Sequence, residues 1–274
     1  MSDPIDQLAD FIERHPRLLV LTGAGMSTAS GIPDYRDKEG NRRGRTPVQG
    51  PDFRKFDAVR RHYWARSMVG YPVLARAAPN NGHLALAALE SQGRLGSLMT
   101  QNVDGLHQRA GSGHVLELHG NIHQVVCLDC HAGFARSFVQ RQLEEANPDL
   151  LSLTAHIAPD GDAHVDTEAL DQFQIPWCVH CNGMLKPDVV FFGDGVPADR
   201  TADAFARMNA ADALLVIGSS LVVFSGFRFC RMAAASGKPV AAVNIGKTRA
   251  DDLLALKLEE AAERVLPGVL ARLG

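Results

Sequence analysis

Short apolar segments that alternate with helical ones constrain this chain more than any other feature of its sequence. The segment 18–21 (LLVL) is apolar at every position, which is typical of a central parallel strand because both faces of such a strand are buried. Similar segments occupy residues 95–100, 115–118, 189–192, 213–217 and 240–245. Helices are predicted at residues 83–92, 199–209 and 225–236, with Gly93 and Gly237 as left-handed caps after the first and the third. This alternation predicts the α/β class, with a Rossmann-like doubly wound parallel sheet.

The alternation lapses near the middle of the chain. This stretch contains all four paired cysteines, a helix predicted near residues 135–146 and a long polar loop at residues 155–175. A separate basic helix is predicted earlier, at residues 53–68. We therefore predict a sheet domain with a small inserted module. The predicted boundaries are residues 1–122 and 186–274 for the sheet domain, 37–75 for a helical excursion within it, and 123–185 for the module.

Composition limits the functions to be considered. With 28 basic and 31 acidic side chains the net charge is -3, so the chain lacks the excess positive charge of proteins that bind nucleic acid mainly through its phosphates. Its apolar runs are far shorter than the roughly 20 residues that a membrane span needs. The first residues, MSDPID, show neither a signal peptide nor the Arg- and Ser-rich character of a transit peptide. We therefore expect a cytoplasmic protein with no nucleic-acid or membrane partner.

Four of the five cysteines form two C-x-x-C pairs, Cys127 with Cys130 and Cys178 with Cys181. Two such pairs can surround a tetrahedral Zn²⁺ with four sulfurs, which leaves no position for a catalytic water. A redox function would instead need one reactive pair beside a βαβ unit. We therefore predict a structural zinc site, although the spacing between the pairs is longer than usual. Cys230 is predicted to be a buried core residue.

The motif GAGMST at residues 23–28 follows the first apolar segment directly. It departs from the dinucleotide fingerprint, because Thr28 replaces the third small residue and a basic segment, 42–45, stands where an acidic residue is expected. Small residues still allow backbone N–H groups to approach a phosphate at the start of a helix. A phosphate-binding turn is the preferred interpretation, and a plain tight turn is the alternative.

Further polar motifs follow apolar segments or turns. The carboxyl ends of parallel strands are where open α/β sheets bind ligands, so side chains there are candidates for a site. A local role competes in three cases: an ion pair for Asp34 and Arg36, helix capping for Asn102 and Asp104, and a structural role for His119. The motifs at residues 218–220 and 244–246 would also fit a dehydrogenase. The motifs are Gly31-Ile32-Pro33-Asp34-Tyr35-Arg36, Thr100-Gln101-Asn102-Val103-Asp104, His119-Gly120, Gly218-Ser219-Ser220 and Asn244-Ile245-Gly246.

Together and in this order, the motifs resemble those of the sirtuins, the NAD-dependent protein lysine deacylases. The resemblance extends from about residue 17 to the C-terminus and includes residues 186–193 (KPDVVFFG). It is strongest with the class II branch, which includes a mitochondrial sirtuin linked to ADP-ribosyl transfer and lipoamide removal. Residues 63–66 (YWAR), 158–162 (APDGD) and 185–194 carry that closer match, and no targeting leader like that of the mitochondrial relative is recognised.

The resemblance implies a Rossmann-type domain, a zinc module and a cleft between them that holds NAD and an acylated lysine of a protein or peptide. Asp104 would bind the nicotinamide amide, and Val190 and Phe191 would lie along the strand that pairs with the substrate backbone. The implied cofactor contacts are Gly23, Ala24, Gly25, Ser27, Asp34, Tyr35, Arg36, Gln101, Asn102, Val103, Asp104, Gly218, Ser219, Ser220, Asn244, Ile245, Gly246 and Ala262.

His119 matches the family's general base, and Asn102 and Asp104 complete the implied catalytic set. As nicotinamide leaves, the acyl oxygen attacks the ribose, and a neutral imidazole then takes a proton from a ribose hydroxyl. A histidine that titrates near neutrality suits this step. The implied products are free lysine, nicotinamide and O-acyl-ADP-ribose.

A further expectation concerns which acyl groups are removed fastest. Tyr63 and Arg66 are three residues apart and therefore lie on one face of the predicted basic helix. Sirtuins that prefer succinyl or glutaryl lysine have a Tyr and an Arg at this spacing, and the guanidinium pairs with the distal carboxylate. We expect acidic or branched acyl chains to be removed faster than acetyl. The alternative is that Tyr63 packs in the core and Arg66 is solvated.

Other functions share these features. A protein ADP-ribosyltransferase would use the same cofactor and cleft, and a sensor would bind NAD or a peptide without catalysis. A hydride-transfer enzyme is less consistent with the sequence because the dinucleotide fingerprint is incomplete. Nicotinamide release that requires an acylated peptide would distinguish the deacylase from these alternatives.

Overall fold

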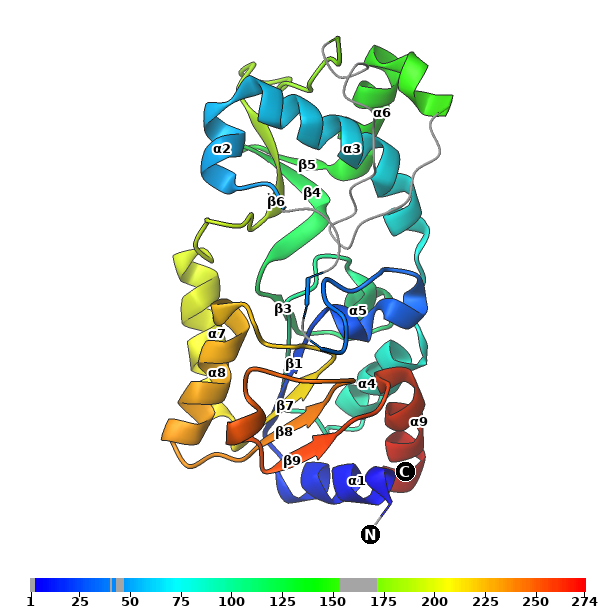
Figure 1. The fold of residues 1–274 in the computed structure, drawn as a ribbon, viewed down its shortest axis with the longest axis vertical. Helices are drawn as coiled ribbons and strands as arrows, with labels where there is room; N and C mark the ends of the chain where they lie inside the picture. Colours follow the sequence, from blue (N-terminus) through cyan, green and yellow to red (C-terminus); the bar gives the residue numbers. More distant parts are fainter. Residues whose placement is uncertain (1–2, 40, 43–46, 153–171) are drawn as a thin grey trace.

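The computed structural model describes residues 3–39, 41–42, 47–152 and 172–274. In these residues the chain forms a six-stranded sheet and a three-stranded sheet, which lie in the lower and upper halves of Figure 1. No helix in the described ranges is long and apolar enough to span a membrane. The motif at residues 158–162 and most of the basic segment 42–45 lie outside the described residues.

The larger sheet is entirely parallel, which confirms the predicted Rossmann-like fold. Its order is β3-β2-β1-β7-β8-β9, so strand order reverses between β1 and β7, where open α/β sheets bind ligands. β1 and β7 are buried at every residue, as their unbroken apolar sequences predict. The strands are β1 (Leu18–Thr22), β2 (Ser97–Thr100), β3 (Val115–Glu117), β7 (Ala213–Ile217), β8 (Val240–Val243) and β9 (Leu256–Leu258).

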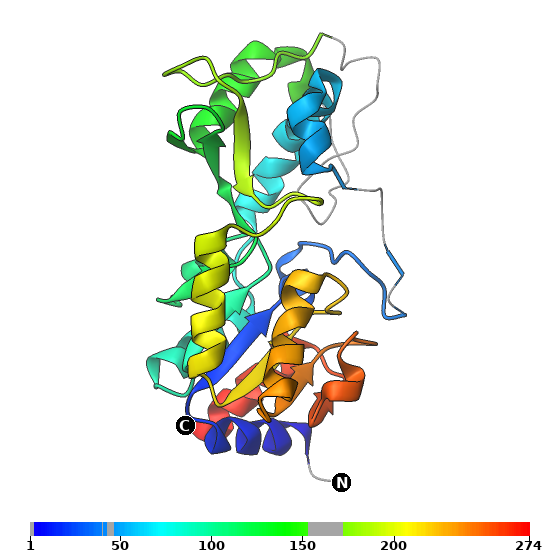
Figure 2. The same ribbon diagram turned by 90° about the vertical axis from the view of Figure 1, so that its left-hand side faces the viewer.

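Helices cover both faces of the larger sheet (Figure 1, Figure 2). Leu18 of β1 packs in the core that contains α1, α4 and α9, whereas Leu19 packs in the core that contains α7 and α8. Gly93 and Gly237 have φ angles of 70° and 66°, which confirms them as left-handed caps. The helices are α1 (Pro4–Arg14), α4 (Asn81–Ser91), α5 (Leu106–Arg109), α7 (Ala198–Ala210), α8 (Phe224–Ala235) and α9 (Ala262–Leu273).

The smaller sheet is antiparallel, with β4 between β5 and β6. Its core contains Trp64 from α3, Val139 from α6 and Leu185 from β6. Part of the predicted helical excursion therefore packs in the core of this sheet. The elements are α2 (Gly50–Lys55), α3 (Asp57–Arg76), β4 (Gly120–Cys127), β5 (Gly133–Ala135), α6 (Arg136–Ala146) and β6 (Leu185–Val189), with short 3-10 helices at η1 (Ala24–Met26), η2 (Thr28–Ser30), η3 (Pro148–Ser152) and η5 (Asp251–Leu253).

Two predictions about elements are wrong. Residues 189–192 are not a strand of the parallel sheet, because β6 ends at Val189 and pairs antiparallel with β4. The apolar character of this segment has another cause, since Phe191 packs in the core of the smaller sheet. The single helix predicted at residues 53–68 is two helices, because Phe56 has an extended backbone (φ -114°, ψ 119°) between α2 and α3.

Candidate active site and metal site

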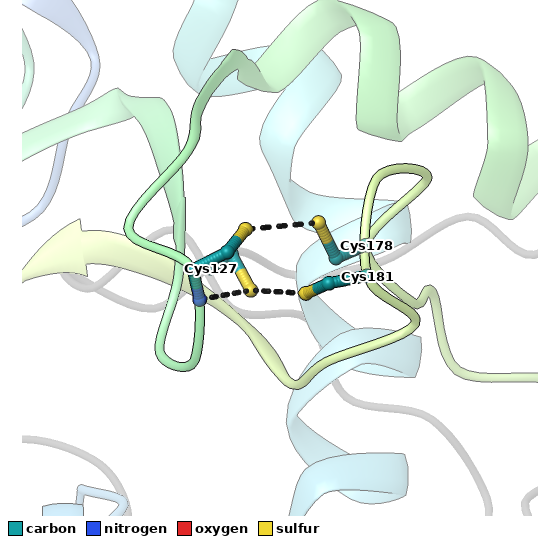
Figure 3. A group of neighbouring side chains, drawn as sticks. Cys127, Cys178 and Cys181 are labelled. Carbon is teal, nitrogen blue, oxygen red and sulfur yellow. Dashed lines mark hydrogen bonds between the residues drawn. The ribbon is translucent and has the colours of Figure 1, made fainter.

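The four paired cysteines lie together beside the smaller sheet, and Figure 3 shows Cys178 and Cys181 facing the segment that carries Cys127. Their sulfur atoms all lie within 4.8 Å of one another. Sγ of Cys127 is 3.5 Å from Sγ of Cys181, and Sγ of Cys130 is 3.7 Å from Sγ of Cys178. A tetrahedron with Zn–S bonds of about 2.3 Å places sulfurs about 3.8 Å apart, so the geometry fits zinc.

The thiols of this cluster differ in how readily they ionise. The backbone N–H of Cys130 lowers the pKa of Cys127 to about 7. Hydrogen bonding to the sulfurs of Cys130 and Cys127 raises the pKa of Cys181 to about 12. Zinc is bound by thiolates, so zinc binding would release the protons that the thiols still carry. Four sulfurs complete the zinc shell, which indicates a structural site.

A cavity of about 1490 Å³ lies where the parallel strands end. Gly23, Gln101, His119, Gly218 and Asn244 follow β1, β2, β3, β7 and β8, and all five line it. The structure thus brings together motifs that are far apart in the sequence, because the carboxyl ends of parallel strands share one edge of the sheet.

Two of the predicted cofactor contacts do not line this cavity, whereas the others do. Ala262 is the first residue of α9 and is buried in the core beside the larger sheet. Gly246 has a φ of 87°, and a Cβ there would lie 2.2 Å from the carbonyl oxygen of Lys38. Glycine at this position therefore allows the loop after β8 to pack against the segment that carries Lys38.

The glycines of the turn at residues 23–28 allow two strand ends to touch. A Cβ on Gly23 would lie 2.7 Å from Cβ of Ser219, and a Cβ on Gly25 would lie 2.9 Å from Cα of Gly218. The N–H of Gly25 donates to the carbonyl of Gly218 (2.8 Å). Close packing of the turn after β1 on the turn after β7 is therefore one physical reason for these glycines.

A buried hydrogen-bonded set fixes Asp104 at the cavity wall. Nδ2 of Asn102 donates to the carbonyl of Gly23 and to Oγ of Ser27, both at 3.0 Å. Ser27 donates in turn to Oδ2 of Asp104 (2.7 Å), whose Oδ1 accepts the N–H of Leu106 (2.9 Å). The Asp104 side chain therefore both binds the first backbone N–H of α5 and lines the cavity, where it can accept a hydrogen bond from a ligand amide.

The imidazole of His119 is held on both sides. Its Nδ1 lies 2.9 Å from the carbonyl oxygen of Gln101, and its Nε2 lies 2.7 Å from Oγ of Ser225. Burial lowers the pKa of His119, the hydrogen bond to Gln101 opposes this shift, and the positive charge of Arg228 adds to it. The ring is therefore neutral near pH 7, and a neutral imidazole can act as a base.

The wall of the cavity beside the smaller sheet is apolar. Ile122 and Val189 line it and belong to the core of that sheet. Tyr63 also lines it, and its ring packs against Phe191 with 5.0 Å between the centroids. Arg66 is not among the described residues that line the cavity. Both residues belong to α3, and the pairing of Arg66 with an acyl carboxylate stays a prediction.

Sequence reasoning missed Ser225 and Arg228 as site residues. Both line the cavity, and both belong to the first two turns of α8. Their signal in the sequence is weak. It consists only of the hydroxyl of Ser225 and the positive charge of Arg228 near the start of a helix that follows the motif at residues 218–220. Position alone did not show that this helix start faces His119.

Comparison with known proteins agrees with this geometry. Residues 23–225 match the model of the Sir2 family. The chain is 53% identical over 259 residues to an NAD-dependent protein deacetylase of Xanthomonas campestris pv. campestris, with 94% of this chain and 88% of the relative covered. It is 52% identical over 263 residues to NAD-dependent protein deacetylase 2 of Bradyrhizobium diazoefficiens, with 96% of both chains covered.

Solved structures show the same fold. A structure of Sir2 with a p53 peptide and NAD+ matches with a TM-score of 0.80 and 29% identity over 98% of both chains. A structure of Sir2 bound to an acetylated peptide matches with a TM-score of 0.79 and 29% identity over the same share of both chains.

Proposed function

The chain belongs to the Sir2 family, and on that basis we propose that it removes acyl groups from protein lysines, using NAD and releasing nicotinamide and O-acyl-ADP-ribose. It is an NAD-dependent protein deacetylase; its partners are acylated lysines, and its cofactors are NAD and zinc. The observation that carries the proposed chemistry is the position of His119, which lines a cavity where five parallel strands end and whose Nδ1 is held by the carbonyl of Gln101.

The cavity has room for NAD together with a substrate segment. Its volume of about 1490 Å³ exceeds the roughly 300–1,000 Å³ typical of small-molecule sites. In this proposal the turn at residues 23–27 holds the pyrophosphate and the nearer ribose, and Asp104 binds the nicotinamide amide. Residues 218–220 and Asn244 hold the adenosine half, and Val190 and Phe191 adjoin the substrate backbone.

The chain's own groups then have defined tasks. NAD, when bound, supplies the ADP-ribosyl group with nicotinamide as its leaving group. Asp104, whose two oxygens already accept hydrogen bonds from Ser27 and Leu106, orients the amide. His119 takes a proton from a substrate hydroxyl, and its Nδ1–H, on the carbonyl of Gln101, stabilises the imidazolium that forms. The zinc site stabilises the smaller sheet and takes no part in the chemistry.

The test is an assay with NAD and an acetylated peptide, in which mass spectrometry follows nicotinamide and O-acetyl-ADP-ribose. We expect both products only when the peptide is present. His119→Ala should lower their formation by about 100-fold or more, because it removes the base, while NAD binding persists. His62→Ala, which changes an exposed histidine of α3, is the matched control and should not affect the rate.

Two other outcomes would replace this proposal. ADP-ribose attached to a protein, without O-acetyl-ADP-ribose, would identify an ADP-ribosyltransferase. NAD binding without any nicotinamide release would identify a sensor.

Three finer features belong to the same proposal. Acyl chains other than acetyl are preferred, because the wall formed by Tyr63, Ile122 and Val189 is extended and apolar. Membership of the class II branch rests on the motif at residues 63–66 and on residues 185–194. The proposed organisation is an NAD-binding domain of residues 1–122 and 186–274 and a zinc-binding module of residues 123–185.

A further inference from the structure

The nitrogen of His119 that acts as the base already has a hydrogen-bond partner within the protein. Its Nδ1 lies 2.9 Å from the carbonyl oxygen of Gln101. A carbonyl only accepts hydrogen bonds, so Nδ1 carries the ring proton and Nε2 of the neutral ring has the lone pair. Oγ of Ser225 lies 2.7 Å from that Nε2, and the Ser225 hydroxyl is therefore the donor.

The fold brings Ser225 to this position through close packing. Ser225 is the second residue of α8, and Gly226 follows it. A Cβ on Gly226 would lie 2.5 Å from Oε1 of Gln101, so the start of the helix packs against the Gln101 side chain. Nε of Arg228 donates to the carbonyl of Ser225 (3.2 Å), which closes the first turn of α8.

The same hydroxyl also faces the reaction space. Both Ser225 and His119 line the cavity, and the Ser225 side chain is neither fully buried nor bound to any other described side chain. A substrate hydroxyl that approaches Nε2 must either displace Ser225 or transfer its proton through Oγ. A serine hydroxyl can transfer a proton in this way, because it can donate one hydrogen bond and accept another at the same time.

On the basis of the proposed function, we propose that Ser225 is a catalytic residue. It relays the proton of the attacking ribose hydroxyl, called here the substrate hydroxyl, to His119. Oγ of Ser225 accepts this proton while its own proton moves to Nε2. The hydroxyl oxygen uses the released electron pair to form its new bond to the acyl carbon, while the π bond between that carbon and the lysine nitrogen breaks and its electron pair moves to the nitrogen. Ser225 is unchanged at the end of the step, and His119 is an imidazolium with Nδ1–H still on Gln101.

One test of this relay needs no bound ligand. In the free enzyme, ¹⁵N NMR of His119 reports whether Nε2 accepts a hydrogen bond. We expect its resonance in Ser225→Ala to move toward the position of an imidazole nitrogen without a donor, and Ser225→Thr to retain the wild-type position. An unmoved resonance in Ser225→Ala would overturn the proposal, because the hydrogen bond would then be absent in solution.

The second test is a single-turnover measurement with NAD and an acylated peptide. We expect Ser225→Ala to slow O-acyl-ADP-ribose formation by about 100-fold, to leave nicotinamide release in the first turnover unchanged, and to be rescued by Ser225→Thr. Product formation within twofold of wild type would overturn the relay. If the wild-type enzyme forms no product, the proposed function itself is wrong. If only Ser225→Ala loses product formation, the proposed function stands and the result supports the relay.

Discussion

Tyr63 and Arg66 are the two residues of α3 that the sequence analysis assigns to the acyl group. Tyr63 is 4% exposed and lines the apolar wall of the cavity, whereas Arg66 is not among the described lining residues. We expect the wild-type enzyme to remove a branched acyl chain faster than acetyl. Tyr63→Ala should change this ranking by about tenfold, because contacts in an apolar pocket discriminate on that scale. The measurement is kcat/KM on acetyl, branched and glutaryl peptides.

The role of Arg66 is decided by the same peptide panel. If its guanidinium binds a distal carboxylate, Arg66→Ala lowers kcat/KM for the glutaryl peptide and leaves acetyl unchanged. Arg61→Ala, on the same helix, is the control, since Arg61 already pairs with Asp57 (2.6 Å). An unchanged ranking in Arg66→Ala would remove Arg66 from the substrate site.

The two cysteine loops together provide the four sulfurs of the zinc site. Cys130 is exposed, so Cys130→Ser removes a zinc ligand with little loss of packing. We expect the zinc content to fall from about one ion per chain toward zero and the melting temperature to fall with it, because zinc binding contributes directly to folding. Metal analysis and thermal unfolding measure the two effects.

The fifth cysteine provides the control for this prediction. Burial raises the pKa of Cys230 in α8 to about 12, so it remains a thiol. Cys230→Ala should therefore retain full zinc content. Retention of zinc by Cys130→Ser, or its loss from Cys230→Ala, would contradict the assignment of the four ligands.

At the scale of the whole molecule, two buried histidines make folding sensitive to acid. Their rings are in contact, tilted by 58° with 4.8 Å between the centroids, and burial lowers the pKa of His83 to about 4 and of His107 to about 3. The unfolded chain takes up protons at about 6.5, so it binds more protons than the folded chain below that pH. The free energy of unfolding should fall from about pH 6.5 to pH 4, by up to about 1.4 kcal/mol per pH unit for each histidine.

Urea unfolding between pH 7 and pH 4.5 measures this slope. Nε2 of His107 lies 2.8 Å from Oγ1 of Thr22, and an amide in His107→Gln offers a similar donor without titrating. The variant should therefore show a shallower pH dependence than the wild-type chain. His62→Gln, at an exposed position, should keep the wild-type slope. Equal slopes for His107→Gln and the wild type would contradict the prediction.

The sequence alone was sufficient to predict those features that depend on residue type or on residues close together in the chain. Burial on both faces identified β1 and β7, left-handed glycines ended two helices, and the chemistry of thiolate pairs identified the zinc site. The order of motifs along the chain was enough to identify the family before any geometry was known. These signals lie within a few residues of one another, or depend only on residue type.

Which side chains share a surface became known only from the three-dimensional arrangement of the chain. Residues 189–192 were mistaken for a parallel strand because an apolar segment has the same pattern in a sheet and in a cavity wall. Ser225 and His119 are 106 residues apart in the chain, and Ser27 and Asp104 are 77 apart. Their contacts depend on the order of the strands and on close packing at glycines, and no local pattern in a single sequence encodes these long-range approaches.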